Sequence, residues 1–558
     1  MSSAPFNLSH ALTEAVALHR QGRLRDADKI YTRVLKAAPD HFDALNLLGA
    51  VKMRLGRVGE AHRLFTTALK LRSDVPQVWA NLGQVLCMLK RPKEALECYD
   101  KAYALAPDNV DVLNGRANVL LSLGRPQESL EQFHELLARV PDHGEAHLNS
   151  GIAHAALGSM EEAIEEFDRA LSVAPGHPVA HYNRGIALYE LGRYADAIDA
   201  HDSVLATAPE HPGAWLNRGR ALAALKRFDD ALASYGKAKA IQKDNPDIHF
   251  MESLALLTVG DYRRGFEKYE ARWRRSGMPE QKSRGRPLWR GDYPLNRKTV
   301  LLHAEQGLGD TIQFARYVPQ LAASGANVIL EVQPELTALL SRLEGAKTVI
   351  AHGAPAPVYD VHCPLGSMPL ALKTEPSNIP APIPYLSADN CRLAKWTARL
   401  GALARPRIAI AWSGNASHLN DRNRSMPFAK LAPLLSSPAR FISIQRELRA
   451  EDEAALAAEQ RVTHVGGELD DFDDTAAVVA LCDLVIAVDT AVVHLAGAMG
   501  RAVWVMLPFA PDWRWTLDGD STPWYPTARL FRQTSLGDWD GVIGNVSGAL
   551  GQFVSTAD

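Results

Sequence analysis

The sequence is poor in cysteine and has no excess of charge of either sign. Its five cysteines are odd in number and never form a Cys-x-x-Cys pair. This argues against a disulfide framework or a structural zinc site and fits a reducing compartment. The 61 Lys and Arg nearly balance 64 Asp and Glu, which leaves a net charge of -3. A chain this balanced has no overall field that would attract nucleic acid or an anionic membrane.

Long apolar runs are also missing. No stretch approaches the roughly 18 consecutive apolar residues that a membrane-spanning helix needs. The N-terminal residues lack the basic region and apolar core of a secretory signal. A hydrophobic content of 47% with 22% charged residues is typical of globular protein. At about 150 residues per domain, we expect three or four domains in a cytoplasmic protein without a transmembrane segment.

The first half of the chain repeats every 34 residues. Small residues recur at Ala27, Ala61, Ala95, Ser129, Ala163, Ala197, Ala231 and Gly265. Four residues after each lie Tyr31, Phe65, Tyr99, Phe133, Phe167, His201, Tyr235 and Tyr269. Twelve residues before each lie Ala15, Gly49, Gly83, Ala117, Gly151, Gly185, Gly219 and Ser253. A fixed period of this length predicts an array of helical hairpins.

The residue types at these positions suit paired helices. Small residues let two helices approach closely, and we expect the aromatic residue to fill the gap between one pair and the next. The turn inside several pairs carries glycine (Gly22, Gly56, Gly124, Gly192), which suits a left-handed helix end. Proline recurs where the second helix should stop (Pro39, Pro107, Pro141, Pro175, Pro209). The pattern resembles the tetratricopeptide repeat (TPR) family and predicts an all-α solenoid of eight units over residues 8–279.

A solenoid of this kind usually offers a concave groove to a peptide or another protein, although it can also serve as a spacer or an oligomerisation surface. An asparagine recurs every 33 to 35 residues, at Asn46, Asn81, Asn114, Asn149, Asn183 and Asn217. Such amides can hydrogen-bond a peptide backbone, as in the TPR domain of O-linked N-acetylglucosamine transferases, which the array resembles. Alternatively, they satisfy neighbouring helix ends. We expect the peptide-groove role.

The second half has a different pattern. Residues 280–297, rich in Arg, Pro and Gly, indicate a connector. Beyond it, predicted strands alternate with predicted helices, which is typical of parallel sheets. The strands are expected at 299–303, 327–332, 407–412, 440–444, 484–488 and 502–506, and the helices at 311–323, 335–343, 428–435, 475–481 and 491–498.

Five prolines within residues 376–386 indicate a hinge-like boundary between two α/β lobes. We place the lobes at residues 298–386 and 387–556. Ligands of such sheets bind at the carboxyl ends of the strands, so the two lobes should enclose a site between them.

One candidate site is the turn Gly307-Leu308-Gly309-Asp310, which follows a strand and opens a helix. Its glycines allow a ligand to approach the backbone, and its free N–H groups attract anions. The alternative is that Asp310 only caps the helix.

A second candidate is the segment from Asp489 to His494. The strand ends at Asp489, and Thr490 opens a helix whose first N–H groups can hold a phosphate. His494 lies one turn later, on the same face as Thr490. A lone histidine is otherwise more often a satisfied structural residue.

A third candidate is the polar loop that contains Ser413, Asn415 and Arg424, which suits a diphosphate or a sugar, unless it is simply a solvated loop. A fourth is the segment 509–526, whose Trp residues, with Asp512, Arg514 and Asp518 between them, can form a sugar or base platform. At least two of these tryptophans are expected to pack on the core instead.

Together these blocks resemble the heptosyltransferase-like bacterial glycosyltransferases, and more closely TPR proteins with a fused glycosyltransferase domain. The blocks are AEQGLGDTIQF from residue 304, GNASHLNDRNRS from residue 414 and DTAVVHLAGAMG from residue 489. The resemblance implies a GT-B pair of Rossmann-type domains that uses a nucleotide-diphosphate sugar and inverts the anomeric centre. It also implies no metal and no cofactor beyond the donor substrate.

Carried over residue by residue, the resemblance makes Asp310 the base that activates the acceptor. Arg424 stands where related enzymes have a lysine on the donor phosphates. The donor block is Asp489, Thr490, Ala491 and His494, with Glu447 as a ribose or base contact. From the candidate turn and polar loop described above, we also expect Gly307, Gly309, Ser413 and Asn415 to contact the donor. Ala491 stands where the heptosyltransferase block usually has glycine, which puts a heptose donor in doubt more than glycosyl transfer itself.

The sequence therefore predicts a glycosyltransferase whose TPR array selects a protein acceptor. Two alternatives stay open: transfer to a glycolipid or polysaccharide intermediate, and a scaffold whose lobes bind a nucleotide sugar without turnover. If the array selects acceptors, removing residues 1–270 should abolish protein modification and spare donor hydrolysis.

Overall fold

The computed structural model describes residues 7–276, 285–380, 382–418 and 420–555. Residues 277–284, which close the predicted solenoid and begin the predicted connector, lie outside the described residues, as do 381, 419 and 556 of the predicted lobes. The chain folds as two compact units, Met1–Arg218 and Gly219–Asp558. The boundary between them falls within helix α13 (Pro212–Ala224).

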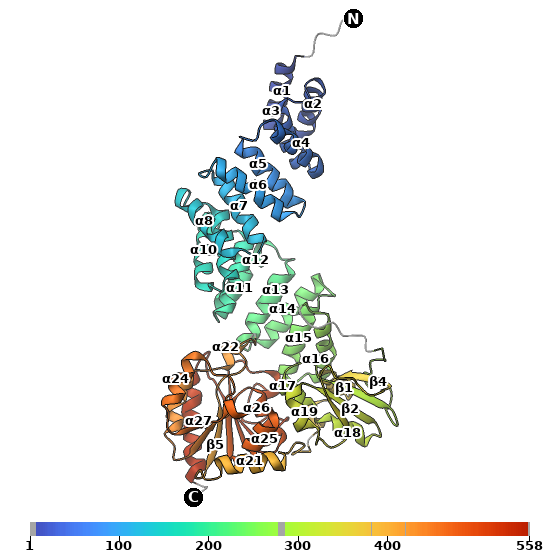
Figure 1. Cartoon of the computed structure of the whole chain (residues 1–558), viewed down its shortest axis with the longest axis vertical. Helices are drawn as coiled ribbons and strands as arrows, with labels where there is room; N and C mark the ends of the chain where they lie inside the picture. Colours follow the sequence, from blue (N-terminus) through green and yellow to red (C-terminus); the bar gives the residue numbers. More distant parts are fainter. Residues whose placement is uncertain (1–6, 277–284, 381, 419, 556–558) are drawn as a thin grey trace. The chain divides into compact units, whose positions relative to one another are not determined.

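Sixteen helices in the described part of the first half form eight helix–turn–helix pairs, so the predicted solenoid is confirmed (Figure 1). They are α1 (Leu8–Arg20), α2 (Leu24–Ala37), α3 (Phe42–Arg54), α4 (Val58–Leu71), α5 (Pro76–Met88), α6 (Pro92–Leu105), α7 (Val110–Ser122), α8 (Pro126–Arg139), α9 (Gly144–Ala156), α10 (Met160–Val173), α11 (Pro178–Glu190), α12 (Tyr194–Thr207), α13, α14 (Phe228–Ile241), α15 (Pro246–Thr258) and α16 (Tyr262–Tyr269). A short 3-10 helix, η1 (Glu270–Arg274), follows the last pair.

The repeated aromatic residue packs within its own helix pair. A Cβ on Gly49 would lie 2.7 Å from the Phe65 ring, and one on Gly151 would lie 2.6 Å from the Phe167 ring. The glycine leaves bare backbone on the first helix, and the ring of the second helix occupies that space. The predicted contact with the next pair is confirmed for Tyr99, since a Cβ on Gly115 of the next pair would lie 2.3 Å from its ring.

The turn inside each pair has a left-handed residue, as the glycines predicted. Gly22 has φ +75° and Gly192 has φ +77°. In the third and seventh repeats a lysine holds the same position, and Lys90 and Lys226 have φ +59° and +60°. The turn geometry is thus imposed by the repeat even where no glycine supplies it.

The first α/β lobe contains a four-stranded parallel sheet in the order β3-β2-β1-β4. Its strands are β1 (Thr299–His303), β2 (Asn327–Val332), β3 (Ala346–Ala351) and β4 (Val361–Pro364), and its helices are α17 (Leu308–Phe314), α18 (Tyr317–Ala323), α19 (Pro334–Leu340) and α20 (Met368–Ala371). The single helix predicted at 311–323 is therefore two helices.

The second lobe contains a six-stranded parallel sheet in the order β10-β9-β8-β5-β6-β7. Its strands are β5 (Arg407–Ala411), β6 (Arg440–Ser443), β7 (Val462–His464), β8 (Leu484–Val488), β9 (Val503–Leu507) and β10 (Ala528–Arg532). Its helices are α21 (Asn390–Leu400), α22 (Asp421–Arg424), α23 (Ala432–Leu435), α24 (Ala450–Ala458), α25 (Phe472–Leu481), α26 (Ala491–Ala498) and α27 (Trp539–Ser555). Counted within the lobe, this order is 3-2-1-4-5-6, that of a dinucleotide-binding fold.

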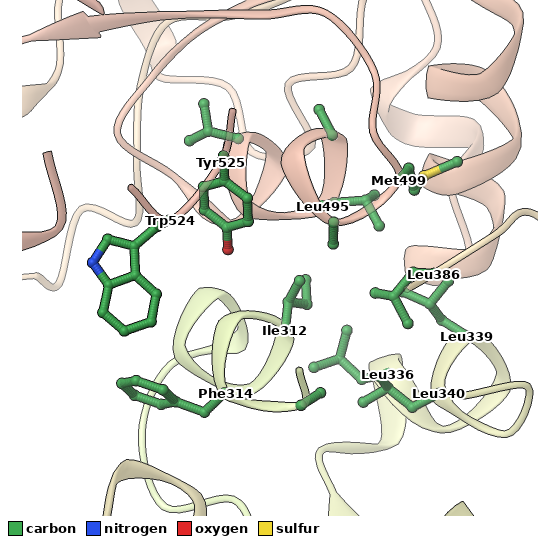
Figure 2. Packing of buried hydrophobic residues seen from close by; sticks show 14 of the residues in the cluster. Ile312, Phe314, Leu336, Leu339, Leu340, Leu386, Leu495, Met499, Trp524 and Tyr525 are labelled. Carbon is green, nitrogen blue, oxygen red and sulfur yellow. The ribbon is translucent and has the colours of Figure 1, made fainter. Parts of the chain in front are cut away.

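The two lobes share one apolar core. Ile312 and Phe314 of α17 belong to the same buried cluster as Leu495 of α26 and the aromatic residues Trp524 and Tyr525 (Figure 2). Figure 2 shows α17 lying against α26, with Leu336, Leu339, Leu340, Leu386 and Met499 extending the same packing. Helices α17 and α26, which carry two of the predicted sites, are therefore in direct contact.

Candidate nucleotide-sugar site

The second and third predicted sites begin at the carboxyl ends of two adjacent strands of the second sheet, β5 and β8. Strand β5 pairs in parallel with β8, and Ala411 lies opposite Ala487. The chain order reverses between these two central strands, so their carboxyl ends form the topological switch point of the sheet. Ligands of open α/β sheets bind at this point. The loop from Trp412 to Asn415 and the segment from Asp489 to Thr490 both start there.

Arg424 bridges these two segments. Its Nη1 donates to the backbone carbonyl of Asp489 at 3.2 Å. A Cβ on Gly414 would lie 2.7 Å from Arg424 Nη2, so the glycine leaves room for the guanidinium. The side chain is 16% exposed, and its Nε has no hydrogen-bond partner among the described residues. Arg424 Nε also lies 3.9 Å from Asp421 Oδ1, beyond hydrogen-bond distance, so the guanidinium keeps donors available for a ligand.

The start of α26 has no side-chain cap. Its N-cap residue is Thr490, in an extended conformation, and the Thr490 hydroxyl is buried without a hydrogen-bond partner among the described residues. The first N–H groups of a helix have no intrahelical acceptor. The residues from Asp489 to Val492 are partly exposed. This helix start therefore meets the electrostatic conditions for binding an anion.

The charge of Asp489 depends on its surroundings. Burial raises the pKa of its carboxyl to about 6, and the nearby Asp512 carboxylate adds to this shift. Contact with Trp515 and the cations of Arg424 and Arg514 act in the opposite direction on this pKa. Near neutral pH this carboxyl is therefore close to the point where it gains or loses its proton.

His494 is buried in the contact between the lobes. Its Nδ1 lies 3.0 Å from the Tyr525 hydroxyl, and its ring stacks on Trp515 with 5.4 Å between centroids. Burial, aided by Arg514, Arg316 and Arg424, lowers its pKa well below the ordinary value. The imidazole is therefore neutral and its Nδ1 has a protein partner, which fits the structural role left open by the sequence, while its donor role stays a prediction.

Asp310 is paired with an arginine from the other lobe. Its Oδ1 accepts a hydrogen bond from Arg514, and its Oδ2 accepts from the Gly307 N–H at 3.0 Å. The capping role that the sequence left open for Asp310 is thus present, together with an ion pair between lobes. The carboxylate is 27% exposed. Each carboxylate oxygen has a further lone pair, so both contacts leave room to accept a proton.

Arg514 is the residue that the sequence placed only in an aromatic platform. Its Nη1 also donates to Asp512 Oδ1 at 2.8 Å, and its Nε donates to Gln313. Burial lowers the pKa of Arg514, but the carboxylates of Asp512 and Asp310 outweigh burial and hold the pKa above its ordinary value. No local sequence pattern joins residues 310 and 514, so only the fold reveals this pair.

The glycines of the first candidate site serve packing and capping. A Cβ on Gly309 would lie 2.8 Å from His494 Cδ2 and 3.4 Å from Ala491 Cα. Gly309 therefore allows α17 to lie directly on α26. The N–H of Gly307 is already bonded to Asp310. The Gly307 N–H is therefore not available to a phosphate, whereas the phosphate contact of Gly309 stays a prediction.

The other predicted donor residues lie on the loops after β5 and β6. Ser413 is buried, and Gln445 fixes its backbone by accepting from its N–H at 3.2 Å and donating to its carbonyl at 3.0 Å. The Asn415 side chain closes its own turn through the Ser417 N–H at 2.8 Å. Glu447 is exposed on the loop after β6, and its carbonyl accepts from Gln445 at 3.1 Å. Gln445, which the sequence did not single out, thus joins both loops.

The tryptophans of segment 509–526 pack on the core. Trp513, Trp515 and Trp524 are all buried, so the packing role is confirmed and the open sugar platform is not formed.

Family models match both halves of the chain. Models described as tetratricopeptide repeat match residues 18–85, 74–142, 114–178 and 182–246. A model described as glycosyltransferase family 9 (heptosyltransferase) matches residues 404–504. The chain therefore contains TPR repeats and a segment that matches glycosyltransferase family 9. The family 9 match includes Arg424 and Asp489 through His494, whereas Asp310 lies outside it.

The chain is also similar to the protein FlbA of Caulobacter vibrioides. The two are 30% identical over 336 residues, which is 55% of this chain and 56% of FlbA. The chain therefore spans about half the length of this relative. Among solved structures, it is similar to a TPR protein from Parabacteroides merdae (18% identity, 45% of this chain and 98% of that one, TM-score 0.36) and to MamA (22%, 30% and 91%, TM-score 0.28). Scores this low add nothing to the argument.

The six predicted groove asparagines of the TPR unit fall into two sets. Measured on the 34-residue period, Asn46 and Asn114 share one position, whereas the other four lie one residue later. One residue turns a helix by about 100°, so the two sets point in different directions. The side-chain oxygens of Asn46 and Asn114 are buried without a hydrogen-bond partner in the described chain.

The later set makes contacts of its own. Asn149 donates to Asn118 at 2.9 Å, Asn183 to the Val179 carbonyl at 2.8 Å and Asn217 to the Tyr182 hydroxyl at 3.3 Å. Asn81 accepts from Gln77 at 3.3 Å. The single continuous amide row expected from the spacing is therefore not formed.

The described residues show neither a metal-binding cluster nor a helix that could span a membrane. They contain no grouping of three or more His, Cys, Asp or Glu side chains arranged to hold a metal ion. None of their helices combines the length and apolar character that crossing a bilayer requires.

Proposed function

We propose that this chain transfers a sugar from a nucleotide-diphosphate donor to an acceptor hydroxyl. The observation that carries the proposal is the uncapped start of α26, which lies beside Arg424 at the switch point of a sheet with dinucleotide-binding order. The glycosyltransferase family 9 match over the same lobe supports it.

Unpaired polar atoms near this point suit an oxygen-rich ligand. Arg424 Nε, Gln313 Nε2 and the Thr490 hydroxyl are buried without hydrogen-bond partners among the described residues. Each of these groups can donate a hydrogen bond. Because buried donors are normally paired, a diphosphate at this site accounts for them better than an apolar ligand does.

The proposed reaction uses Asp310 as the base. As the acceptor oxygen attacks the anomeric carbon, its proton passes to an Asp310 oxygen, and the bond from that carbon to the diphosphate breaks. The electron pair leaves with the diphosphate, whose charge is stabilised by Arg424 and the first N–H groups of α26. Attack from the face opposite the leaving group inverts the anomeric centre. We propose that these protein cations and dipoles act without a metal.

We further propose that the TPR array selects a protein as the acceptor, because repeats of this kind bind peptides in their grooves. A non-catalytic scaffold is the second candidate function. The observation that favours it is that both oxygens of Asp310 already have protein partners.

Two variants test the donor site and the base. We expect Arg424→Gln to weaken nucleoside-diphosphate binding about 10- to 100-fold, because it removes a charged donor worth about 1.5–3 kcal/mol. Arg422→Gln is the matched control, since Arg422 lies on the same short helix but is exposed. Calorimetry that finds equal affinity in the two variants would refute the phosphate role of Arg424.

Asp310→Asn should keep nucleotide affinity and lower sugar transfer about 10²- to 10⁴-fold, the usual contribution of a general base. The donors for this assay are identified by thermal shift with a panel of nucleotide sugars, and chelator is added in parallel to test independence from metals. Equal transfer by Asp310→Asn and wild type would sink the base assignment. Tight nucleotide binding with no turnover by the wild type would establish the scaffold instead.

A further inference from the structure

The first lobe also has a switch point, and it lies next to the proposed base. In the order β3-β2-β1-β4, the chain runs outward from β1 to β2 and β3 and then crosses back to the edge strand β4, on the other side of β1. Residues 304–310, called the 304–310 loop below, comprise the loop after β1 and the first turn of α17, and β4 is followed by Leu365–Ser367. Glu305 joins the two by accepting a hydrogen bond from the Gly366 N–H at 3.0 Å. By topology, this is where the lobe would take a ligand.

The last TPR repeat occupies this position with a charged side chain. Arg272 of η1 donates through Nη2 to Glu305 Oε1 at 3.0 Å and to Ser367 Oγ at 2.8 Å. Its Nη1 donates to Glu270 Oε1 at 2.6 Å, and Ser367 Oγ donates to the same oxygen at 2.7 Å. Arg272 is only 1% exposed. One guanidinium is thus held between two carboxylates and both loops of the switch point.

A second contact from the same repeat reaches the next residue of the loop. Gln306 Nε2 donates to the Tyr269 hydroxyl at 2.7 Å, and the Gln306 carbonyl accepts from Gln333 at 2.8 Å. Gln333 in turn accepts from the Thr311 hydroxyl at 3.0 Å. The loop that ends at Asp310 is therefore fixed at Glu305 and Gln306 by the repeat, and at Thr311 by its own lobe.

A charged network is an unusual way to attach the repeat. On its other side, the repeat packs through apolar rings, since Tyr262 and Phe266 lie against Trp513 at 5.9 and 5.5 Å between centroids. Replacing a buried ion pair by apolar packing is often neutral or stabilising, so attachment alone does not call for Arg272 and Glu305. Burial raises the pKa of Glu305 to about 7, although Arg272 opposes this shift. Hydrogen bonds between charged groups have a preferred geometry, whereas apolar contacts do not. The network therefore fixes the position of the 304–310 loop relative to the repeat.

We propose that Arg272 is a positioning residue for Asp310, so that activation of the acceptor depends on the last turn of the TPR array. This inference rests on the proposed function. Arg272 does not contact Asp310; it sets the backbone of the 304–310 loop through Glu305, Gly366 and Ser367. The donor site on α26 belongs to the other lobe and makes no use of this network.

The test compares Arg272→Met, which keeps side-chain bulk, with Glu252→Gln in the same repeat. Glu252 is a buried carboxylate paired with Lys239 at 2.8 Å and Lys268 at 3.1 Å, and no contact joins it to the 304–310 loop in the described structure. Three quantities are measured on the full chain: kcat and KM for sugar transfer, the Kd of a nucleoside diphosphate by calorimetry, and hydrogen–deuterium exchange of residues 304–314.

We expect Arg272→Met to lower kcat about 10- to 100-fold, the usual cost of misplacing a catalytic group by about 1 Å. Its nucleotide Kd should stay within twofold of wild type, and exchange over 304–314 should become faster. Arg272→Lys keeps the cation for Glu305 and should recover part of kcat; it also replaces Arg272→Met in the comparison should that variant not fold. Glu252→Gln should change none of the three quantities.

An Arg272 variant with wild-type kcat and wild-type exchange would overturn the proposal. So would an increase in nucleotide Kd that matches the loss of kcat, because that result indicates a general loss of structure. Failure of the proposed function gives a different result, because the wild type itself then binds nucleotide but transfers no sugar. In that case, hydrogen–deuterium exchange of residues 304–314 still shows whether Arg272 fixes the loop.

Discussion

At the scale of single residues, the site is organised by arginines from distant parts of the chain. Arg514 holds Asp310, and Arg424 contacts the backbone of Asp489. Both arginines act to lower the pKa of the Asp489 carboxyl, against the effect of burial. Together with burial and Arg316, they also lower the pKa of His494. The result is a neutral imidazole and a titratable carboxyl beside the start of α26, in a region suited to a ligand with two negative charges.

The pKa of Asp489 predicts that donor binding depends on pH. Because this pKa is raised to about 6, the folded protein holds the proton at a pH where a free aspartic acid has lost it. The contribution of this carboxyl to stability therefore falls as the pH rises from its ordinary pKa through 6. A bound diphosphate disfavours the ionised carboxylate further, so we expect nucleotide-sugar affinity to fall about tenfold between pH 5.5 and 7.5.

The measurement is calorimetry with a nucleotide sugar, whose diphosphate keeps a constant charge over this range. Asp489→Asn should bind with a nearly constant affinity, close to the wild-type value at low pH. A pH dependence of equal size in the variant would assign the effect to another group, such as His418 on the loop between β5 and α22, and contradict this prediction.

The contact of Gly309 with His494 predicts a second outcome. The His494 ring is held by Tyr525 and Trp515, so it has no room to move away from a Cβ placed 2.8 Å from its Cδ2. We expect Gly309→Ala to lower the free energy of unfolding of the C-terminal unit by about 1–3 kcal/mol, the usual cost of overpacking, and so to lower its thermal midpoint. Nucleotide affinity should fall with it, because the start of α26 must shift.

Gly548→Ala is the matched control for this variant. Gly548 also lies in a helix, but a Cβ there would meet nothing within 4 Å. Removing an exposed helical glycine should stabilise the unit by up to about 1 kcal/mol. Equal effects of the two substitutions on the thermal midpoint would show that the approach of α17 to α26 does not depend on Gly309.

At the scale of elements, periodicity predicted the long and strongly patterned segments. β1, β2, β8 and α26 have the predicted bounds, because each is a short apolar run between clear turn residues. The helix predicted at 311–323 is interrupted at Ala315 and Arg316, since Pro319 cannot donate to the Ala315 carbonyl and would clash with it. Strands β3, β4, β7 and β10 were not predicted: all four are edge strands of their sheets, and polar or charged residues interrupt each of them.

The left-handed turn of the third repeat predicts an easy gain in stability. Lys90 is exposed and has φ +59°, whereas the equivalent residue of the next repeat is Gly124 with φ +71°. A non-glycine residue pays about 1 kcal/mol or more for this conformation. We therefore expect Lys90→Gly to raise the thermal midpoint of the N-terminal unit, and Gly124→Lys to lower it by a similar amount. A lower midpoint for Lys90→Gly would contradict the prediction.

Lys226 has the same conformation but serves as a contrast. Its ammonium group lies 4.3 Å from the centroid of the Phe509 ring. Lys226→Gly removes this contact as well as the strain, so its gain should be smaller than that of Lys90→Gly.

At the scale of the whole molecule, the sequence predicted which segments carry chemistry but not how they are joined. Local motifs identified the start of α26, the loop with Arg424 and the turn at Asp310. The partners Arg514, Gln445 and Arg272 could not be found in this way, because each acts on a segment that is distant along the chain. Spacing also could not show that the repeated asparagines divide into two sets, since a shift of one residue is small in sequence and large on a helix.

The compact unit that begins at Gly219 predicts where the chain can be divided. Removing residues 1–270 would take away Tyr262 and Tyr269 and cut into η1, although the sequence suggested that this truncation spares donor hydrolysis. A fragment of residues 285–558 would leave Glu305 without Arg272. The fragment would also expose Trp513, against which Tyr262 and Phe266 pack. In addition, Trp524 would lose its hydrogen bond to the Tyr262 hydroxyl, at 3.0 Å.

We therefore expect residues 211–558 to fold and to bind a nucleoside diphosphate with the affinity of the full chain. Residues 285–558 should unfold at a much lower temperature and lose that affinity. Thermal unfolding followed by tryptophan fluorescence, with calorimetry on the same samples, decides between the two fragments. If 285–558 melts and binds like 211–558, the last two repeats contribute nothing to the transferase unit; if neither fragment binds, residues 1–210 are needed as well. If residues 211–558 bind the nucleotide and residues 285–558 do not, the last two repeats are part of the transferase unit.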